Sequence, residues 1–250
     1  MVDLSIGARF EAGRVLKHAM TIFKHDALAI ALLSVLFIAV PDALVTYAPV
    51  LLADERISAA ARNTWVIIIV NPMIAMLGST LLQATISSRA LMGMDGRDRP
   101  SGDRFFGSFQ DYLAVIALGL VTTLGIMGGF VLLVIPGIIL SLAWMVAVPA
   151  MVTERLGVMD AIRRSNKLTG ERRGEIFGLC VAAGLIGLLL SWLATLAFSA
   201  VGNSLVTTIG GSVTQTLTSA ANALLAVAIY YELRWSKEGT PAESLAAVFA

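Results

Sequence analysis

Residues 136–170 read PGIILSLAWMVAVPAMVTERLGVMDAIRRSNKLTG, and they pass from an apolar run to a cluster of charges. The uncharged part begins earlier, because no Asp, Glu, Lys or Arg occurs from residue 112 to residue 152. A helix needs about 20 apolar residues to cross the ~30 Å hydrocarbon core of a bilayer. The run therefore predicts two crossings that turn near Pro136 and Gly137, and the charges that follow mark the membrane surface.

The composition of the whole chain indicates an integral membrane protein. Of its 250 residues, 57% are hydrophobic and only 14% are charged, and the mean hydropathy is +0.83, outside the usual range of soluble domains. Apolar runs predict six transmembrane helices at about 27–47, 64–87, 112–134, 137–152, 176–201 and 213–231. We expect an all-α, polytopic fold that forms one membrane domain over residues 1–250, with a polar connection between the last two spans around residues 202–215.

The distribution of basic residues predicts the orientation of the six spans. All Lys and Arg residues except Arg56 and Arg62 fall on one side of this topology. Cytoplasmic loops carry the excess of Lys and Arg in membrane proteins. We therefore expect a multi-pass protein of the bacterial inner (cytoplasmic) membrane with both termini in the cytoplasm.

Two segments outside the spans have amphipathic, helical spacing. One covers about residues 5–24, and it either lies in the headgroup layer or packs on the rest of the protein. The other is an elbow helix at about residues 158–168. An acid, namely Asp26, Asp111 or Glu175, directly precedes an outgoing span in three places. This pattern is consistent with three repeats of an interfacial helix and two spans, or with a generic interfacial pattern.

The elbow after residue 153 holds the main candidate contact. Glu154 ends a span, and the turn at Gly157 brings the next helix back toward it. Arg164 is the expected partner, because a guanidinium can hold a carboxylate with two hydrogen bonds. The other expected elbow residues are Pro136, Gly137, Pro149, Arg163, Ser165, Lys167 and Thr169, with Ser165 and Thr169 fixing the elbow helix against the bundle. The contact is either a structural lock or part of a ligand site, and the elbow cations either bind anionic headgroups or only set the topology.

The same stretch resembles a known family. The residues that carry the resemblance are Pro136-Gly137-Ile138, Pro149, Glu154, Gly157, Ala161, Arg164-Ser165 and Leu168-Thr169. Together they resemble the signature of the glycerophosphoryl diester phosphodiesterase membrane-domain family and its relatives among uncharacterised six-span bacterial proteins. The resemblance implies a six-span membrane domain. In some members of that family this domain is fused to a catalytic barrel, which this chain is too short to hold.

The inventory of reactive side chains argues against catalysis. Phosphodiester hydrolysis uses a metal held by carboxylates and a group for proton transfer, but the only histidines are His18 and His25, without a carboxylate cluster beside them. Cys180 is single and lies inside a span, where packing is its ordinary role. We therefore expect no enzyme activity, no cofactor or metal, and no nucleic-acid partner.

Two functional classes stay open. The first is a non-catalytic scaffold or accessory protein that interacts with membrane lipids. The second is a small-molecule or lipid transporter with an intramembrane polar site around Asp42 and Asn71, whose structural alternative is a hydrogen bond at a proline-disrupted helix. A lipid-filled groove beside the interfacial helices would favour the first class, and a water-filled cavity reaching Asp42 and Asn71 would favour the second. Small-residue spacings such as Gly125 and Gly129 predict either close packing inside the molecule or contact with a second copy or another membrane protein.

Overall fold

The computed structural model describes residues 11–44, 71–94, 109–202 and 204–238. These residues form helices and no strands, which confirms the all-α fold class. The elements are α1 Ala12–Ser34, η1 Val35–Ala39, α4 Asn71–Met94, α5 Phe109–Leu132, α6 Val134–Trp144, α7 Ala147–Glu154, α8 Val158–Thr169, α9 Arg173–Ser199 and α10 Ser204–Glu238.

Five segments within the described residues are long and apolar enough to cross a membrane. They are Asp26–Leu44, Gln110–Leu132, Val134–Glu154, Arg173–Ser199 and Ile209–Lys237. They correspond to five of the six expected spans. The remaining expected span, at 64–87, begins outside the described residues, and α4 covers its second part.

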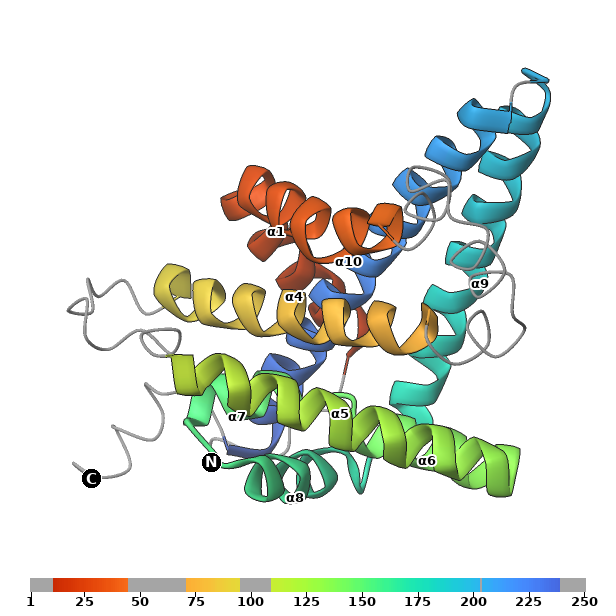
Figure 1. Cartoon of the computed structure of the whole chain (residues 1–250). Helices are drawn as coiled ribbons and strands as arrows, with labels where there is room; N and C mark the ends of the chain where they lie inside the picture. Colours follow the sequence, from red (N-terminus) through yellow and green to blue (C-terminus); the bar gives the residue numbers. More distant parts are fainter. Residues whose placement is uncertain (1–10, 45–70, 95–108, 203, 239–250) are drawn as a thin grey trace, which may run out of the picture.

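The core lies where the second half of α10 packs against α1 and α4. Ala223, Val227, Tyr230 and Leu233 of α10 are fully buried there. A second cluster of buried side chains joins α4, α5, α7 and α8 around Met151. By contrast, Ile176 is the one buried residue of α9, which extends with α10 as a long hairpin whose connecting end projects beyond the other helices (Figure 1).

The first amphipathic segment and the first span form one continuous element with a kink. Asp26 has the non-helical angles φ −130° and ψ 27° inside α1, and its carboxylate accepts hydrogen bonds from Arg89 Nε at 3.3 Å and Nη2 at 2.9 Å. Asp26, the acid directly before the first span, therefore lies at a bend of α1, and Arg89 of α4 stabilises that bend. The segment just before Asp111 lies outside the described residues, so the expectation of three repeats stays a prediction.

The polar connection expected around residues 202–215 is wrong in extent, because α10 already begins at Ser204. Hydroxyl groups in this segment donate back to their own helix, as Thr214 does to the Gly210 carbonyl and Thr216 to the Ser212 carbonyl. Such bonds allow Ser and Thr to lie inside a helix that crosses apolar surroundings. The connection between α9 and α10 is therefore a short turn around Gly202, whose φ is +70°.

Glycine allows the close approach of α5 and α6. A Cβ on Gly125 would overlap the ring of Trp144, and one on Gly129 would lie 3.0 Å from the Cα of Gly137. Only one residue, Leu133, separates the two helices, and Pro136 lies in the first turn of α6, where its missing N–H costs no helical hydrogen bond. The spacing of Gly125 and Gly129 therefore serves packing inside the molecule.

Candidate functional site

The elbow between α7 and α8 contains the expected carboxylate–guanidinium contact. Arg164 Nε donates to Glu154 Oε1 at 2.9 Å and to Oε2 at 2.8 Å, and both side chains are 19% exposed. Arg155 adopts the left-handed conformation at the end of α7, with φ 53°. This turn reverses the chain so that α8 returns along the bundle, and the predicted contact between Glu154 and Arg164 is confirmed.

Sequence reasoning missed the third member of this contact. The Tyr230 hydroxyl, from α10, donates to Glu154 Oε1 at 2.9 Å and accepts from Thr153 Oγ1 at 2.6 Å. Tyr230 is fully buried, and it lies 76 residues from Glu154 along the chain. The contact therefore ties the elbow to α10, which no local spacing in the sequence indicates.

Ser165 and Thr169 fix α8 against the bundle as expected. The Ser165 hydroxyl donates to the Ala143 carbonyl at 2.7 Å, and Thr169 Oγ1 lies 3.4 Å from the same oxygen. This carbonyl lies at the end of α6, where helical partners are absent. Pro149 explains the break between α6 and α7, because proline has no N–H and its ring excludes a helical carbonyl four residues earlier, at Met145.

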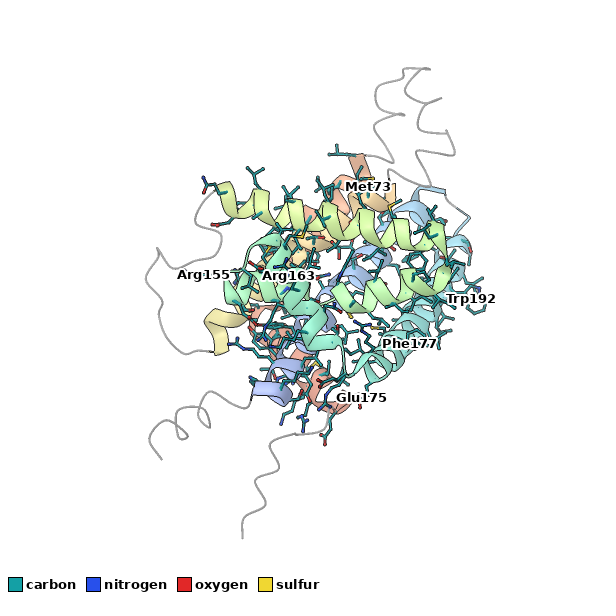
Figure 2. The ribbon with its side chains drawn as sticks, turned by 90° about the horizontal axis from the view of Figure 1, so that it is seen from below. Met73, Arg155, Arg163, Glu175, Phe177 and Trp192 are labelled. Carbon is teal, nitrogen blue, oxygen red and sulfur yellow. The ribbon has the colours of Figure 1, made fainter. Side chains whose placement is uncertain are left out.

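The remaining elbow cations make looser contacts. Arg163 Nη1 lies 3.4 Å from Asp160 Oδ1, and both side chains are mostly exposed. Lys167 is exposed, and its backbone carbonyl accepts from Lys237 Nζ at 2.9 Å. Figure 2 shows Arg155 and Arg163 at the elbow and Phe177 and Trp192 along α9 at the edge of the molecule. Of the cations expected to turn toward Glu154, Arg164 is the one that the structure brings to the carboxylate.

A buried acid of α10, Glu232, anchors the N-terminal helix, and this contact was not predicted from the sequence. Glu232 is 1% exposed, and it accepts hydrogen bonds from Arg14 Nη2 at 2.8 Å and Nε at 3.0 Å and from the Glu11 backbone N–H at 3.3 Å. The Glu232 carboxylate raises the pKa of Arg14, whereas burial beside Trp235 lowers the pKa of His18. One feature of the sequence points to Glu232, because it is the first charged residue after the uncharged stretch of residues 176–231. The side chain of His25 lies outside the described residues.

Asp42, one of the two residues of the expected intramembrane polar site, contacts Ser212 in the structure. Ser212 Oγ of α10 donates to Asp42 Oδ2 at 2.8 Å. The side chain of Asn71 lies outside the described residues, so the expected pair of Asp42 with Asn71 stays a prediction. Asp42 does not line either of the two cavities described below.

An apolar groove lies between the N-terminal helix and the α9–α10 hairpin. Its volume is about 600 Å³, which is within the range of small-molecule sites. Three groups of side chains line it: Leu16, Ala19, Met20 and Phe23 of α1; Ala183, Ile186, Gly187, Leu190 and Ala194 of α9; and Thr214, Leu217, Thr218, Ala221, Asn222, Leu224 and Leu225 of α10. Leu16, Met20 and Phe23 are the apolar residues that made the N-terminal segment amphipathic in sequence, and they are exposed toward this groove.

A smaller cavity of about 260 Å³ lies among six helices of the bundle. Side chains from α4, α5, α6, α7, α9 and α10 line it, including Ser79, Thr80, Gln83, Thr122, Ser141 and Asn222. The lining also contains Cys180, whose Sγ lies 3.5 Å from the sulfur of Met145. These six hydroxyl and amide side chains lie in a lining that is otherwise mostly apolar and contains no charged residue; we call this space the polar cavity.

A bundle with membrane-length apolar helices and ion pairs gathered at their charged ends defines an integral membrane protein. The chain belongs to the family described as domain of unknown function (DUF7847), whose model matches residues 104–233. It is also similar to a UPF0259 membrane protein of Pectobacterium carotovorum subsp. carotovorum, with 36% identity over 95 residues. The matched stretch covers 38% of this chain and 38% of that relative. No solved structure matches the chain.

These comparisons support an uncharacterised bacterial membrane family. Neither the family description nor the name of the relative refers to the glycerophosphoryl diester phosphodiesterase membrane domain. The resemblance of residues 136–169 to that domain is therefore not confirmed.

Proposed function

We propose that this chain is a non-catalytic integral membrane protein of the bacterial inner membrane that binds membrane lipid as a scaffold or accessory protein. The observation that carries the proposal is the apolar groove of about 600 Å³ between α1 and the α9–α10 hairpin. The amphipathic N-terminal helix supplies one wall of this groove, as expected for a lipid-interacting protein. The family resemblance of the elbow, at residues 136–169, is consistent with a membrane domain of this kind.

The elbow and the N-terminal anchor have structural roles in this proposal. Arg164 and Arg14 each hold a poorly exposed carboxylate, at Glu154 and Glu232 respectively. The exposed side chains of Lys167 and of Arg163, which also contacts Asp160, lie where they can attract anionic headgroups, and each cation near the membrane surface contributes ~1 kcal/mol of attraction.

A substitution that fills the groove tests the lipid role. Leu217 lines the groove and is 66% exposed, and Leu188 of α9 is 69% exposed but lies outside the groove lining. Native mass spectrometry of protein released gently from membranes should show less retained lipid for Leu217→Trp than for the wild type. The matched control Leu188→Trp should retain lipid like the wild type. Equal retention in all three proteins would contradict the proposal.

The proposed orientation places both termini and the elbow in the cytoplasm. It is supported by the positive-inside distribution of Lys and Arg and by the ion pairs that join α1, α4 and α10 at their charged ends. Single-cysteine variants of a Cys180→Ala protein test it with a membrane-impermeant thiol reagent. A cysteine at position 56 should react from the periplasm and one at position 163 should be protected, whereas the reverse pattern would contradict the orientation.

Transport of a lipid or small molecule is the second candidate function. The observation that favours it is the polar cavity of about 260 Å³, which contains hydroxyl and amide groups but is not lined by Asp42. A transporter that acts through this cavity would use the hydroxyl and amide groups of α4, α5, α6 and α10, in addition to or in place of Asp42 and Asn71. Uptake of a labelled lipid into proteoliposomes distinguishes this function from binding alone.

A further inference from the structure

The apolar groove and the polar cavity lie side by side. Ala183, Asn222 and Leu225 line both of them, so the two spaces share a wall built by α9 and α10. Along α10 the groove runs from Thr214 to Leu225, a rise of about 16 Å. A single elongated molecule can therefore extend along the groove and place one end beside the polar cavity.

The hydrogen-bonding groups in the cavity lining determine which chemical group can lie at the end of the bound molecule. The hydroxyls of Thr80, Thr122 and Ser141 donate to carbonyls of their own helices at 2.7, 2.8 and 2.8 Å. Because each hydroxyl has a single hydrogen to donate, these side chains offer only acceptor lone pairs to the cavity. Three of the four hydroxyl groups in the lining therefore offer acceptors, and an end group that donates hydrogen bonds fits them.

Two amide side chains complete the polar lining. Within the part of the chain that the structure describes, Gln83 and Asn222 make no side-chain hydrogen bond, and both line the cavity. Asn222 lies near the middle of the spanning helix α10, where a polar group without a partner costs free energy because lipid tails cannot hydrogen-bond. A hydroxyl group can both donate to and accept from such an amide.

An ionised head group does not fit this site. Neither the groove nor the cavity has a Lys, Arg, Asp or Glu in its lining. A phosphate or carboxylate placed there would lose its hydration without a counter-charge, and this loss is expensive in an apolar interior. The bilayer lipid that fits has an uncharged head.

We propose that the groove and the cavity together bind one uncharged, hydroxyl-bearing lipid of the diacylglycerol class, taken from the surrounding bilayer. Its hydrocarbon lies in the groove against Met20 and Leu217, and its hydroxyl head bonds to Asn222 and Gln83. This inference rests on the proposed lipid-binding function and names the lipid class. It also gives a reason for the two amides in the membrane interior.

The test uses the full-length protein in nanodiscs of phosphatidylethanolamine and phosphatidylglycerol that contain dioleoylglycerol. Native mass spectrometry measures the lipids that stay bound after release. Each of Asn222→Leu and Gln83→Leu should lower retained dioleoylglycerol about threefold, and the double variant about tenfold, because each loses one hydrogen bond of modest net strength. Retention of phosphatidylglycerol should not change.

Gln215→Leu is the matched control, because Gln215 is an exposed amide of α10 that lines neither space. It should retain dioleoylglycerol like the wild type. Leucine favours insertion of a spanning helix, and thermal unfolding in detergent verifies that each variant is folded. If both cavity variants retained dioleoylglycerol like the wild type while Leu217→Trp lost lipid, the assigned head group would be wrong and lipid binding would stand. If Leu217→Trp also lost no lipid, the proposed function itself would fail.

Discussion

Glu154 is the residue on which three helices depend at the elbow. It ends α7, it accepts from Arg164 of α8, and it accepts from Tyr230 of α10. A carboxylate that is mostly removed from water needs such partners, because an unpaired charge in this position is costly. The contact therefore sets the position of α8 relative to the bundle.

Neutralising Glu154 should destabilise the fold. Glu154→Gln keeps the shape but weakens the charge-assisted bonds to Arg164 and leaves its guanidinium partly buried without a counter-charge, so we expect a loss of about 1–3 kcal/mol. Arg164→Lys should also destabilise, because an ammonium group does not reproduce the position of Nε. Thermal unfolding of the detergent-solubilised protein measures both effects.

The neighbouring exposed pair supplies the control for this measurement. Asp160 and Arg163 are 64% and 80% exposed, and exposed ion pairs contribute little. Asp160→Asn should therefore leave the unfolding temperature close to that of the wild type. The structural lock is refuted if Glu154→Gln is no more harmful than Asp160→Asn.

The sequence predicted the residues of this lock only in part. Glu154, Arg164, Ser165 and Thr169 could be found because they lie within one short stretch, where a turn and a helical period relate their positions. Tyr230 could not be found, because its approach depends on how α10 packs. The same limit applies to Arg14 and Glu232, which are 218 residues apart. Packing between distant helices, rather than local chemistry, decides these partners.

At the scale of elements, the first span contains a break in regular helical hydrogen bonding at the place where α4 packs against it. Pro41 has no N–H to donate to Phe37, four residues earlier, and the helix widens into the π-helical turn η1, where Val40 N–H donates to the Val35 carbonyl. Gly78 of α4 lies against the Phe37 carbonyl, and a Cβ on Gly78 would overlap that oxygen. The proline and the glycine are thus complementary parts of one helix contact.

Gly78→Ala should therefore push α4 away from the first span. Overpacking of this kind costs about 1–3 kcal/mol, although alanine favours helix by up to about 1 kcal/mol. Gly128→Ala on α5 is the control, since no atom lies within 4 Å of a Cβ there, and it should be neutral or slightly stabilising. Thermal unfolding separates the two variants, and equal effects would refute the close contact.

The positions of helices could be predicted from the spacing of apolar and charged residues. The residues that contact each other across different helices could not. The elbow helix was expected at residues 158–168 and lies at Val158–Thr169, because its charged and apolar residues have a clear helical period. The break between α6 and α7 was not predicted, since Pro149 lies in an apolar run whose hydropathy is the same whether or not the helix is interrupted. The start of α10 was misplaced because Ser and Thr are typical of loops but here donate hydrogen bonds back to their own helix.

At the scale of the whole molecule, the apolar groove is a consequence of the way the α9–α10 hairpin is attached. The hairpin joins the bundle mainly through the buried half of α10, and Ile176 is the one fully buried residue of α9. Its connecting end projects away from α1 (Figure 1). The sequence predicted the helices that form this groove, but the opening between them depends on the angle of the hairpin, for which no sequence pattern gives a value.

A cryo-electron microscopy structure of the protein in lipid nanodiscs would show directly whether the groove holds a lipid. The predicted result is elongated density in the groove, in contact with Met20 and Leu217, that approaches Asn222 at one end. A hairpin closed against α1, with Met20 packed on Leu217 and no room for a lipid chain, would contradict the account.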